Sequence, residues 1–83
     1  MRKTTRQARE IARRIVVDPE VRFGQPIIKG TRVPVSVLLE ELAGGTEVRE
    51  IAREYGVTRE DIRAAIRFAA ELVATEDRMV ANR

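Results

Sequence analysis

The stretch from Phe23 to Leu39 constrains the fold more than any other part of the sequence, because it holds two of the three prolines and two of the five glycines. Gly24 and Gly30 favour tight turns, since glycine adopts backbone conformations that a Cβ atom hinders. Pro26 and Pro34 push the residue before each of them towards an extended conformation, and each withholds a backbone donor. The stretch therefore predicts a small β element that docks on a helical body.

The β element is expected over residues 15–35, in short pieces separated by turns. The β-prone pieces are Ile15–Val17, Val21–Phe23, Ile27–Ile28 and Arg32–Val33. Strands this short are not stable alone. They need the helices, or the matching edge of a second copy, as a partner.

Three helices are predicted after the β element. They cover residues 37–43, 47–55 and 59–75. Each follows a serine or threonine that suits an N-cap, and glycines end the first two. These caps are Ser36, Thr46 and Thr58. The fold class is therefore predicted as mainly α, with one domain over residues 15–76 and a tail over 77–83.

The first 14 residues read as a basic extension. Residues 1–16 carry six bases against Glu10 alone, a balance of +5 that leaves −2 for the rest of a chain whose net charge is +3. Apolar residues at helical spacing favour a short basic helix over residues 5–15. They are Ala8, Ile11, Ala12 and Ile15. The extension is either a solvated tail or an arm that touches phosphate or an acidic partner. The candidate DNA contacts in it are Arg2, Lys3 and Arg6.

Length and composition bound the class of protein. A chain of 83 residues buries one small core. Charged residues make up 35% and hydrophobic residues 43%, a composition typical of soluble globular domains. No apolar run approaches the roughly 20 residues of a membrane span, and the charged amino terminus lacks a signal-peptide core. We therefore expect a cytoplasmic protein without membrane contact.

The segments around Gly56 have the layout of a helix-turn-helix. The helix at 47–55 is the first helix, Gly56-Val57 is the turn, and the segment from Thr58 onward is the candidate reader. Asp61 lies three residues after Thr58, as in a capping box. Three-helix packing without a role in DNA binding gives a similar pattern, so both interpretations stay open.

A row of arginines lies on one flank of the third predicted helix. Arg59, Arg63 and Arg67 recur every four residues, where they could contact phosphates or guanine edges together with Thr58. The alternative is a solvated face on which Arg63 and Arg67 pair with Glu60 and Glu71 at helical spacing.

The candidate protein interface is apolar. Phe68 and Leu72 lie on the other flank of the third helix, where they can pack on the β element or on a second copy. The complete predicted interface comprises Ile27, Ile28, Val33, Phe68 and Leu72. Because so small a core is only marginally stable, we expect a homodimer or a complex with a partner protein.

Catalysis has little support in the sequence. Cysteine and histidine are absent, which removes disulfides, the usual zinc ligands and the commonest nucleophile–base pairs. No P-loop or nucleophile elbow occurs, and the carboxylates are scattered at salt-bridge spacing. We expect a protein that is not an enzyme and that has no catalytic residues, metal site or cofactor.

The run from Val17 to Val35 contains Gly-Gln-Pro-Ile-Ile-Lys-Gly-Thr-Arg, and it resembles the bacterial and archaeal domain-of-unknown-function family 433 (DUF433). The later Leu-Ala-Gly-Gly, Glu-Val-x-x-Ile-Ala-x-x-Tyr and Asp-Ile-x-x-Ala-Ile segments match in order, so that the resemblance covers about residues 14–73. Phe23 departs from the pattern, because many members have glycine there. The residues that match the turn core of the family are Gly24, Pro26, Gly30, Thr31 and Arg32.

The resemblance implies a homeodomain-like trihelical fold with an N-terminal β element. Family members are often encoded beside a PIN-like nuclease and are regarded as antitoxins of type II toxin–antitoxin pairs. Such a protein would neutralise its toxin by contact and would bind promoter DNA as a helix-turn-helix dimer. The alternative is a protein-interaction module on the same scaffold that does not bind DNA. The resemblance brings no catalytic residues.

Overall fold

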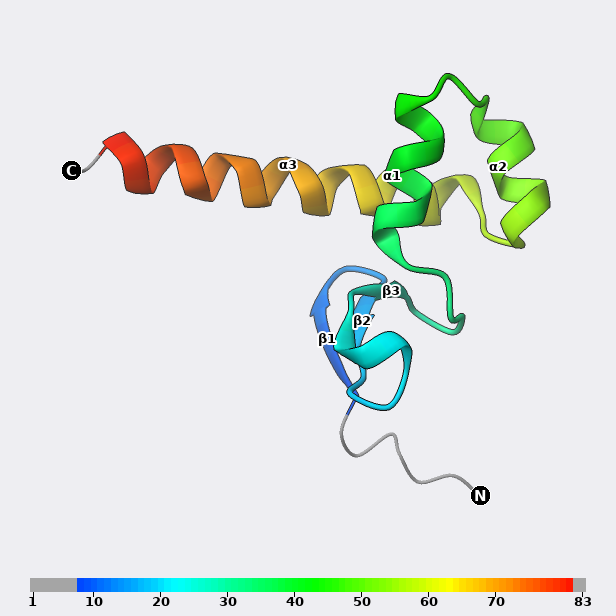
Figure 1. The fold of residues 1–83 in the computed structure, drawn as a ribbon, viewed down its shortest axis with the longest axis horizontal. Helices are drawn as coiled ribbons and strands as arrows, with labels where there is room; N and C mark the ends of the chain where they lie inside the picture. The colour runs from blue at the N-terminus through cyan, green and yellow to red at the C-terminus, as the bar shows by residue number, and fades with distance from the viewer. Residues whose placement is uncertain (1–7, 82–83) are drawn as a thin grey trace.

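The computed structural model describes residues 8–81 and places a small sheet beside a body of three helices (Figure 1). The strands are β1 (Arg9–Ala12), β2 (Ile15–Val17) and β3 (Ile27–Ile28). The helices are α1 (Val35–Ala43), α2 (Val48–Tyr55) and α3 (Arg59–Ala81). The fold is mainly helical with a β element near the amino terminus, as the sequence predicted, and that element is a three-stranded antiparallel sheet whose first strand begins at Arg9. Within residues 8–81, no helix is both long and apolar enough to cross a membrane.

The sheet has the order β1-β2-β3, and its centre is the strand that carries the buried Ile15. Ile15 pairs with Ile28 of β3 on one side and with Ala12 of β1 on the other. An irregularity between Glu10 and Ala12 shifts the register of the β1–β2 pair. Both isoleucines are fully buried and so join the sheet to the helical core.

The amphipathic helix expected over residues 5–15 is wrong for the described residues, because residues 9–12 form β1 and residues 15–17 form β2. Arg13 and Arg14 make the turn between them, and Arg14 has a φ of 68°. The apolar residues at helical spacing do not share one buried face. Ile15 of β2 is buried, whereas Ile11 of β1 is 41% exposed. In the sheet, β1 pairs with β2 and β2 pairs with β3, and this pairing satisfies the backbone N–H and C=O groups of the segment.

The piece predicted as extended at Val21–Phe23 is a tight turn instead. Arg22, Phe23 and Gly24 have φ values of 51°, 58° and 80°, all in the left-handed region. Gly24 and Gln25 donate their backbone N–H groups to the carbonyl oxygens of Val21 and Arg22, at 3.0 and 3.1 Å. The side chain of Phe23 is fully exposed, so that no packing of its ring within residues 8–81 offsets the unfavourable backbone conformation.

The core lies where the sheet meets the three helices. Its fully buried side chains are Ile15, Ile28, Leu38, Ile51 and Ile62. The N-cap predictions hold only in part, because α1 already begins at Val35, and the N-cap of α2 is Glu47 rather than Thr46. The hydroxyl of Thr46 donates to the Glu41 carboxylate at 2.8 Å instead.

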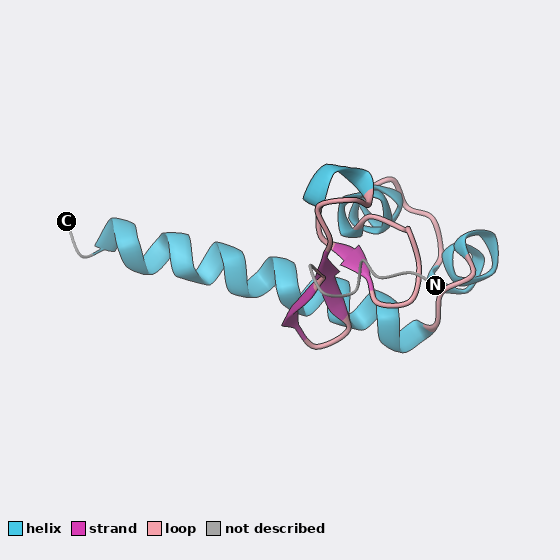
Figure 2. Cartoon of the chain, turned by 90° about the horizontal axis from the view of Figure 1, so that it is seen from below, coloured by secondary structure: helices cyan, strands magenta, loops and turns pink. Residues whose placement is uncertain are grey.

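Helix α3 continues to Ala81, beyond the end predicted at residue 75. The chain has no glycine or proline between Val57 and Ala81, so that nothing in the sequence stops the helix. Its second half runs clear of the sheet and of the other two helices in both views (Figure 2). Residues 70–79 are all exposed.

Replacing Phe23 by glycine is expected to stabilise the chain, since glycine occupies the left-handed region without the cost of about 1 kcal/mol or more that a side chain imposes. The extra flexibility of glycine in the unfolded chain offsets part of this gain. We expect thermal unfolding to shift upwards by a few degrees, at about 4–8 °C per kcal/mol for a domain of this size. Phe23→Ala is the matched control, because it removes the exposed ring but keeps the Cβ atom. A glycine variant that is less stable than the alanine variant would contradict this explanation.

Candidate functional site

The turn between α2 and α3 has the geometry that the sequence predicted. Gly56 follows α2 in the left-handed conformation, with a φ of 68°. The backbone N–H of Val57 donates to the carbonyl oxygen of Ala52 at 3.1 Å. The side chain of Val57 is buried at the corner between the two helices. The turn therefore fixes the direction in which α3 leaves the body.

A reciprocal capping box fixes the first turn of α3. The backbone N–H of Thr58 donates to Oδ2 of Asp61 at 2.9 Å, and the backbone N–H of Asp61 donates to Oγ1 of Thr58 at 3.0 Å. Asp61 is the one charged residue that is buried within residues 8–81. The predicted cap is confirmed, and in it the Thr58 hydroxyl oxygen accepts one hydrogen bond while its O–H group can still donate.

Arg14 joins this helix start to the β1–β2 hairpin. Its guanidinium donates to Oδ1 of Asp61 at 2.8 Å and to Oε1 of Glu60 at 2.6 Å. Both oxygens of the Asp61 carboxylate are therefore in use, one for the cap and one for Arg14. Because charge-assisted bonds of this kind are directional, the pair orients the hairpin relative to α3.

Glu10 holds the hairpin turn that presents Arg14. Its carboxylate accepts the backbone N–H of Arg14 at 3.1 Å and the ammonium of Lys29 at 3.1 Å. The hydrogen bond from Arg14 is the main cause that holds the pKa of Glu10 below its usual value, and Lys29 adds to the effect. The backbone N–H of Lys29 also donates to the Arg14 carbonyl at 2.8 Å. The turn is thus tied to β3 by both backbone and side chains.

A groove of about 500 Å³ runs between the hairpin and α3. The hairpin contributes Ile11, Ala12, Arg13 and Arg14. Helix α3 contributes Glu60, Arg63, Ala64, Arg67, Phe68 and Glu71. Two arginines of the row, Arg63 and Arg67, therefore line the groove, while the third, Arg59, lies outside it.

The arginine row makes no ion pair with any of residues 8–81. Arg59, Arg63 and Arg67 are all exposed. The alternative pairing of Arg63 with Glu60 is wrong, since Glu60 is bound by Arg14, and the pairing of Arg67 with Glu71 is not formed either. The row is thus available to an external anion. The other candidate DNA contacts, Arg2, Lys3 and Arg6, lie outside the described residues.

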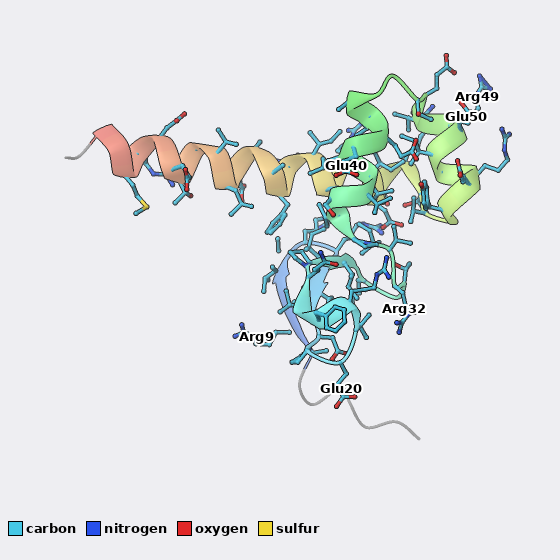
Figure 3. All side chains as sticks on the ribbon, in the orientation of Figure 1. Arg9, Glu20, Arg32, Glu40, Arg49 and Glu50 are labelled. Atoms are coloured by element: carbon cyan, nitrogen blue, oxygen red, sulfur yellow. The ribbon has the colours of Figure 1, made fainter. Side chains whose placement is uncertain are left out.

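The residues assigned to the turn core surround the connection between β3 and α1. Gly30 has a φ of 82°, and the Thr31 hydroxyl donates to the Ile28 carbonyl at 2.8 Å while accepting the backbone N–H of Val33 at 2.9 Å. The carbonyl of Pro26 accepts the backbone N–H of Val35 at 3.0 Å. Arg32 points away from the sheet into solvent (Figure 3).

The residues of the candidate protein interface differ widely in their exposure. Ile27 and Ile28 are 4% and 0% exposed, so they belong to the core and have almost no surface to offer a partner. Val33 and Phe68 are half-buried, and Leu72 is 54% exposed. Phe68 and Leu72 border a second, apolar groove of about 210 Å³ beside Pro26, Val35 and Leu39.

Sequence reasoning missed Arg13, Arg14 and Ile11 as parts of a site. The reason is that the helical spacing of the apolar residues masked the hairpin. No group of three or more side chains that could hold a metal ion occurs within residues 8–81.

A polar link joins α1 to α2. The Glu41 carboxylate accepts the Tyr55 hydroxyl and the Thr46 hydroxyl, each at 2.8 Å. The bond from Tyr55, and then the bond from Thr46, hold the pKa of Glu41 below its usual value. The hydrogen bond that the Tyr55 hydroxyl donates to Glu41 raises the pKa of Tyr55.

Comparison with known proteins gives a family match over most of this framework. The sequence profile of the family described as "Protein of unknown function (DUF433)" matches residues 15–69. A curated protein of Mycobacterium tuberculosis (strain ATCC 25618 / H37Rv) named "Putative antitoxin VapB45" is 36% identical over 52 residues, which are 63% of this chain and 22% of that protein. The chain thus spans about a fifth of the length of this curated relative.

Two solved structures share the fold. The crystal structure of Rv2018 from Mycobacterium tuberculosis has a TM-score of 0.59 at 36% identity and covers 63% of this chain and 24% of its own. The crystal structure of a DUF433 member protein from Anabaena variabilis ATCC 29413 has a TM-score of 0.67 at 33% identity. This second match covers 82% of this chain and 68% of the other.

The link between Glu41, Tyr55 and Thr46 predicts how stability depends on pH. Because folding lowers the pKa of Glu41 below 4.5, its contribution is present above that pH and is lost as the pH falls through the folded value. Glu41→Gln should therefore lower the thermal midpoint at about pH 7 and differ less from the wild type at about pH 3. Thermal unfolding of both proteins over this range checks it, with Glu40→Gln as the exposed control. A difference between the two thermal midpoints that stays constant with pH would contradict the role given to the Glu41 carboxylate.

Proposed function

The chain belongs to the DUF433 family, and from that premise we propose that it is an antitoxin of a type II toxin–antitoxin pair. In this proposal it neutralises a PIN-like toxin by direct contact and binds promoter DNA as a homodimer in the cytoplasm. The name of the curated relative supports the antitoxin role. The single observation that carries the proposal is the exposed row of Arg59, Arg63 and Arg67, which has no carboxylate partner within residues 8–81.

DNA binding would follow the logic of a homeodomain-like helix-turn-helix. Helix α2 and the turn at Gly56 set the angle of α3, and the capping box of Thr58 and Asp61 holds its first turn rigid. The arginine row then lies along one exposed side of the reader helix, where guanidinium groups can bind phosphates or guanine edges. A two-fold dimer would place two such helices about one turn of DNA apart.

Contact with a toxin would use exposed apolar surface. Helix α3 exposes much of the surface of several large apolar side chains. These are Ile66, Leu72, Val73 and Met79, each of which is roughly half exposed or more. Buried apolar surface of this kind usually dominates stable protein interfaces.

The alternative function is a protein-interaction module that does not bind DNA. The observation in its favour is charge, since residues 17–83 together carry −2 although the whole chain carries +3. In that case the toxin contact remains, whereas the arginine row serves solubility or protein binding.

A gel-shift titration against the DNA upstream of its own gene, over a series of salt concentrations, tests DNA binding. Simultaneous replacement of Arg59, Arg63 and Arg67 by alanine should weaken binding and reduce the salt slope by about 0.9 for each phosphate contact that is lost. Replacement of Arg22, Arg32 and Arg78 removes the same charge elsewhere and should have a much smaller effect.

Three outcomes separate the alternatives. Unchanged affinity in the first triple variant would refute the reader assignment. Loss of affinity only in an Arg2, Lys3 and Arg6 triple variant would move the contact to the amino terminus. Co-purification with the product of the adjacent gene, without any salt-sensitive shift of DNA, would select the protein-interaction module.

A further inference from the structure

We propose that the groove between the β1–β2 hairpin and α3 binds an acidic segment of a partner protein that carries one apolar anchor residue. This inference rests on the proposed function, because it names the chemistry by which the chain would recognise its toxin. It adds the groove of about 500 Å³ to the exposed apolar side chains of α3 as a second part of that contact.

The groove combines an apolar floor with a basic rim. Ile11 and Phe68 provide the large apolar surfaces, and Ala12 and Ala64 lie beside them. Ile11 is 41% exposed although it belongs to a strand of the sheet, so its side chain has open surface to offer. Such a floor fits an aliphatic or aromatic side chain of a partner.

The charges of the rim define the rest of the occupant. Arg13, Arg63 and Arg67 line the groove without an ion pair to any of residues 8–81, whereas Arg14 and Glu60 neutralise each other. Glu71 alone opposes the three free cations, so that the lining retains a charge of +2. Guanidinium groups in this number favour carboxylates, which they bind with two parallel hydrogen bonds.

Both walls of the groove are held in place before any partner arrives. The Arg14 bonds to Asp61 and Glu60 fix the distance between the hairpin and α3. Glu10 fixes the hairpin turn through its bonds to Arg14 and Lys29. A partner therefore need not order these elements on binding, which lowers the entropic cost of the complex.

The size and chemistry of the groove favour a protein segment over a duplex. A volume of about 500 Å³ accommodates a few side chains, whereas a DNA duplex would touch only the rim arginines. Phosphates would also leave the apolar surface of Ile11 and Phe68 without a partner. An acidic peptide with an apolar residue uses both parts of the groove.

The first test is an NMR titration of the full-length ¹⁵N-labelled chain with a synthetic peptide of alternating glutamate and leucine. Amide shifts should concentrate on the hairpin and on residues 60–71 of α3. A peptide with serine in place of leucine should bind roughly tenfold more weakly or worse, because it lacks the anchor. Equal binding of the two peptides, or shifts located elsewhere, would overturn the proposal. Larger shifts on the hairpin, at residues 11–14, with duplex DNA than with the peptide would overturn it in favour of nucleic acid, whereas DNA bound by the arginine row alone would shift α3 without the hairpin.

The second test uses matched charge reversals. Arg63→Glu with Arg67→Glu should weaken leucine-peptide binding at least roughly tenfold, since two charge-assisted contacts become repulsive. Arg49→Glu with Arg53→Glu makes the same change of charge on α2, outside the groove, where Arg49 points away from the body (Figure 3). Equal weakening in both variants would show attraction by overall charge alone and would overturn the site. Ile11→Ser should weaken binding without altering charge, and dispersed NMR spectra verify that each variant is folded.

A binding assay with the purified toxin that the proposed function expects from the adjacent gene separates this inference from the proposed function. If the wild-type chain binds that toxin and the Arg63/Arg67 reversal binds it equally well, the groove assignment fails while the antitoxin role stands. If the wild-type chain does not bind the toxin, the antitoxin role fails, and the peptide titration still decides whether the groove takes acidic segments.

Discussion

The guanidinium of Arg14 connects the two parts of this molecule. From the turn between β1 and β2 it binds Asp61 and Glu60, which lie in the first turn of α3. Asp61 is itself committed to the N-cap through Thr58, so a single carboxylate links helix initiation to the placement of the sheet. Because the core is small, this polar link supplies orientation that apolar packing alone specifies less sharply.

The position of the functional surfaces follows from that link. With the hairpin held against one side of α3, Arg63 and Arg67 become the rim of a groove, while Arg59 lies outside it. The second half of α3 extends beyond the body and leaves Leu72 and Met79 exposed. The chain thus offers a basic groove and a helix end on which Leu72 and Met79 are exposed among charged residues.

The sequence predicted the parts of the fold that depend on local chemistry. Thr58 with Asp61, and the turn at Gly56, were predictable because caps and left-handed turns have short-range rules. The hairpin was missed because apolar spacing at residues 8–15 fits both a helix and a bulged strand, and only pairing with β3 decides between them. The arginine row could be placed on α3, but the wall that turns part of it into a groove comes from residues about 50 positions away in the chain, a contact that no local pattern encodes.

A double-mutant cycle between Arg14 and Asp61 tests the central link most directly. The free energy of unfolding would be measured for the wild type, Arg14→Met, Asp61→Ala and the double variant. Loss of the cap to Thr58 occurs in both arms and cancels, so the cycle isolates the pair. We expect a coupling of about 1 kcal/mol, reduced from that of a buried pair because the Arg14 side chain is 34% exposed. If the destabilisation of the double variant equals the sum of the two single variants to within about 0.3 kcal/mol, this account is contradicted, because the Arg14–Asp61 pair would then not place the hairpin.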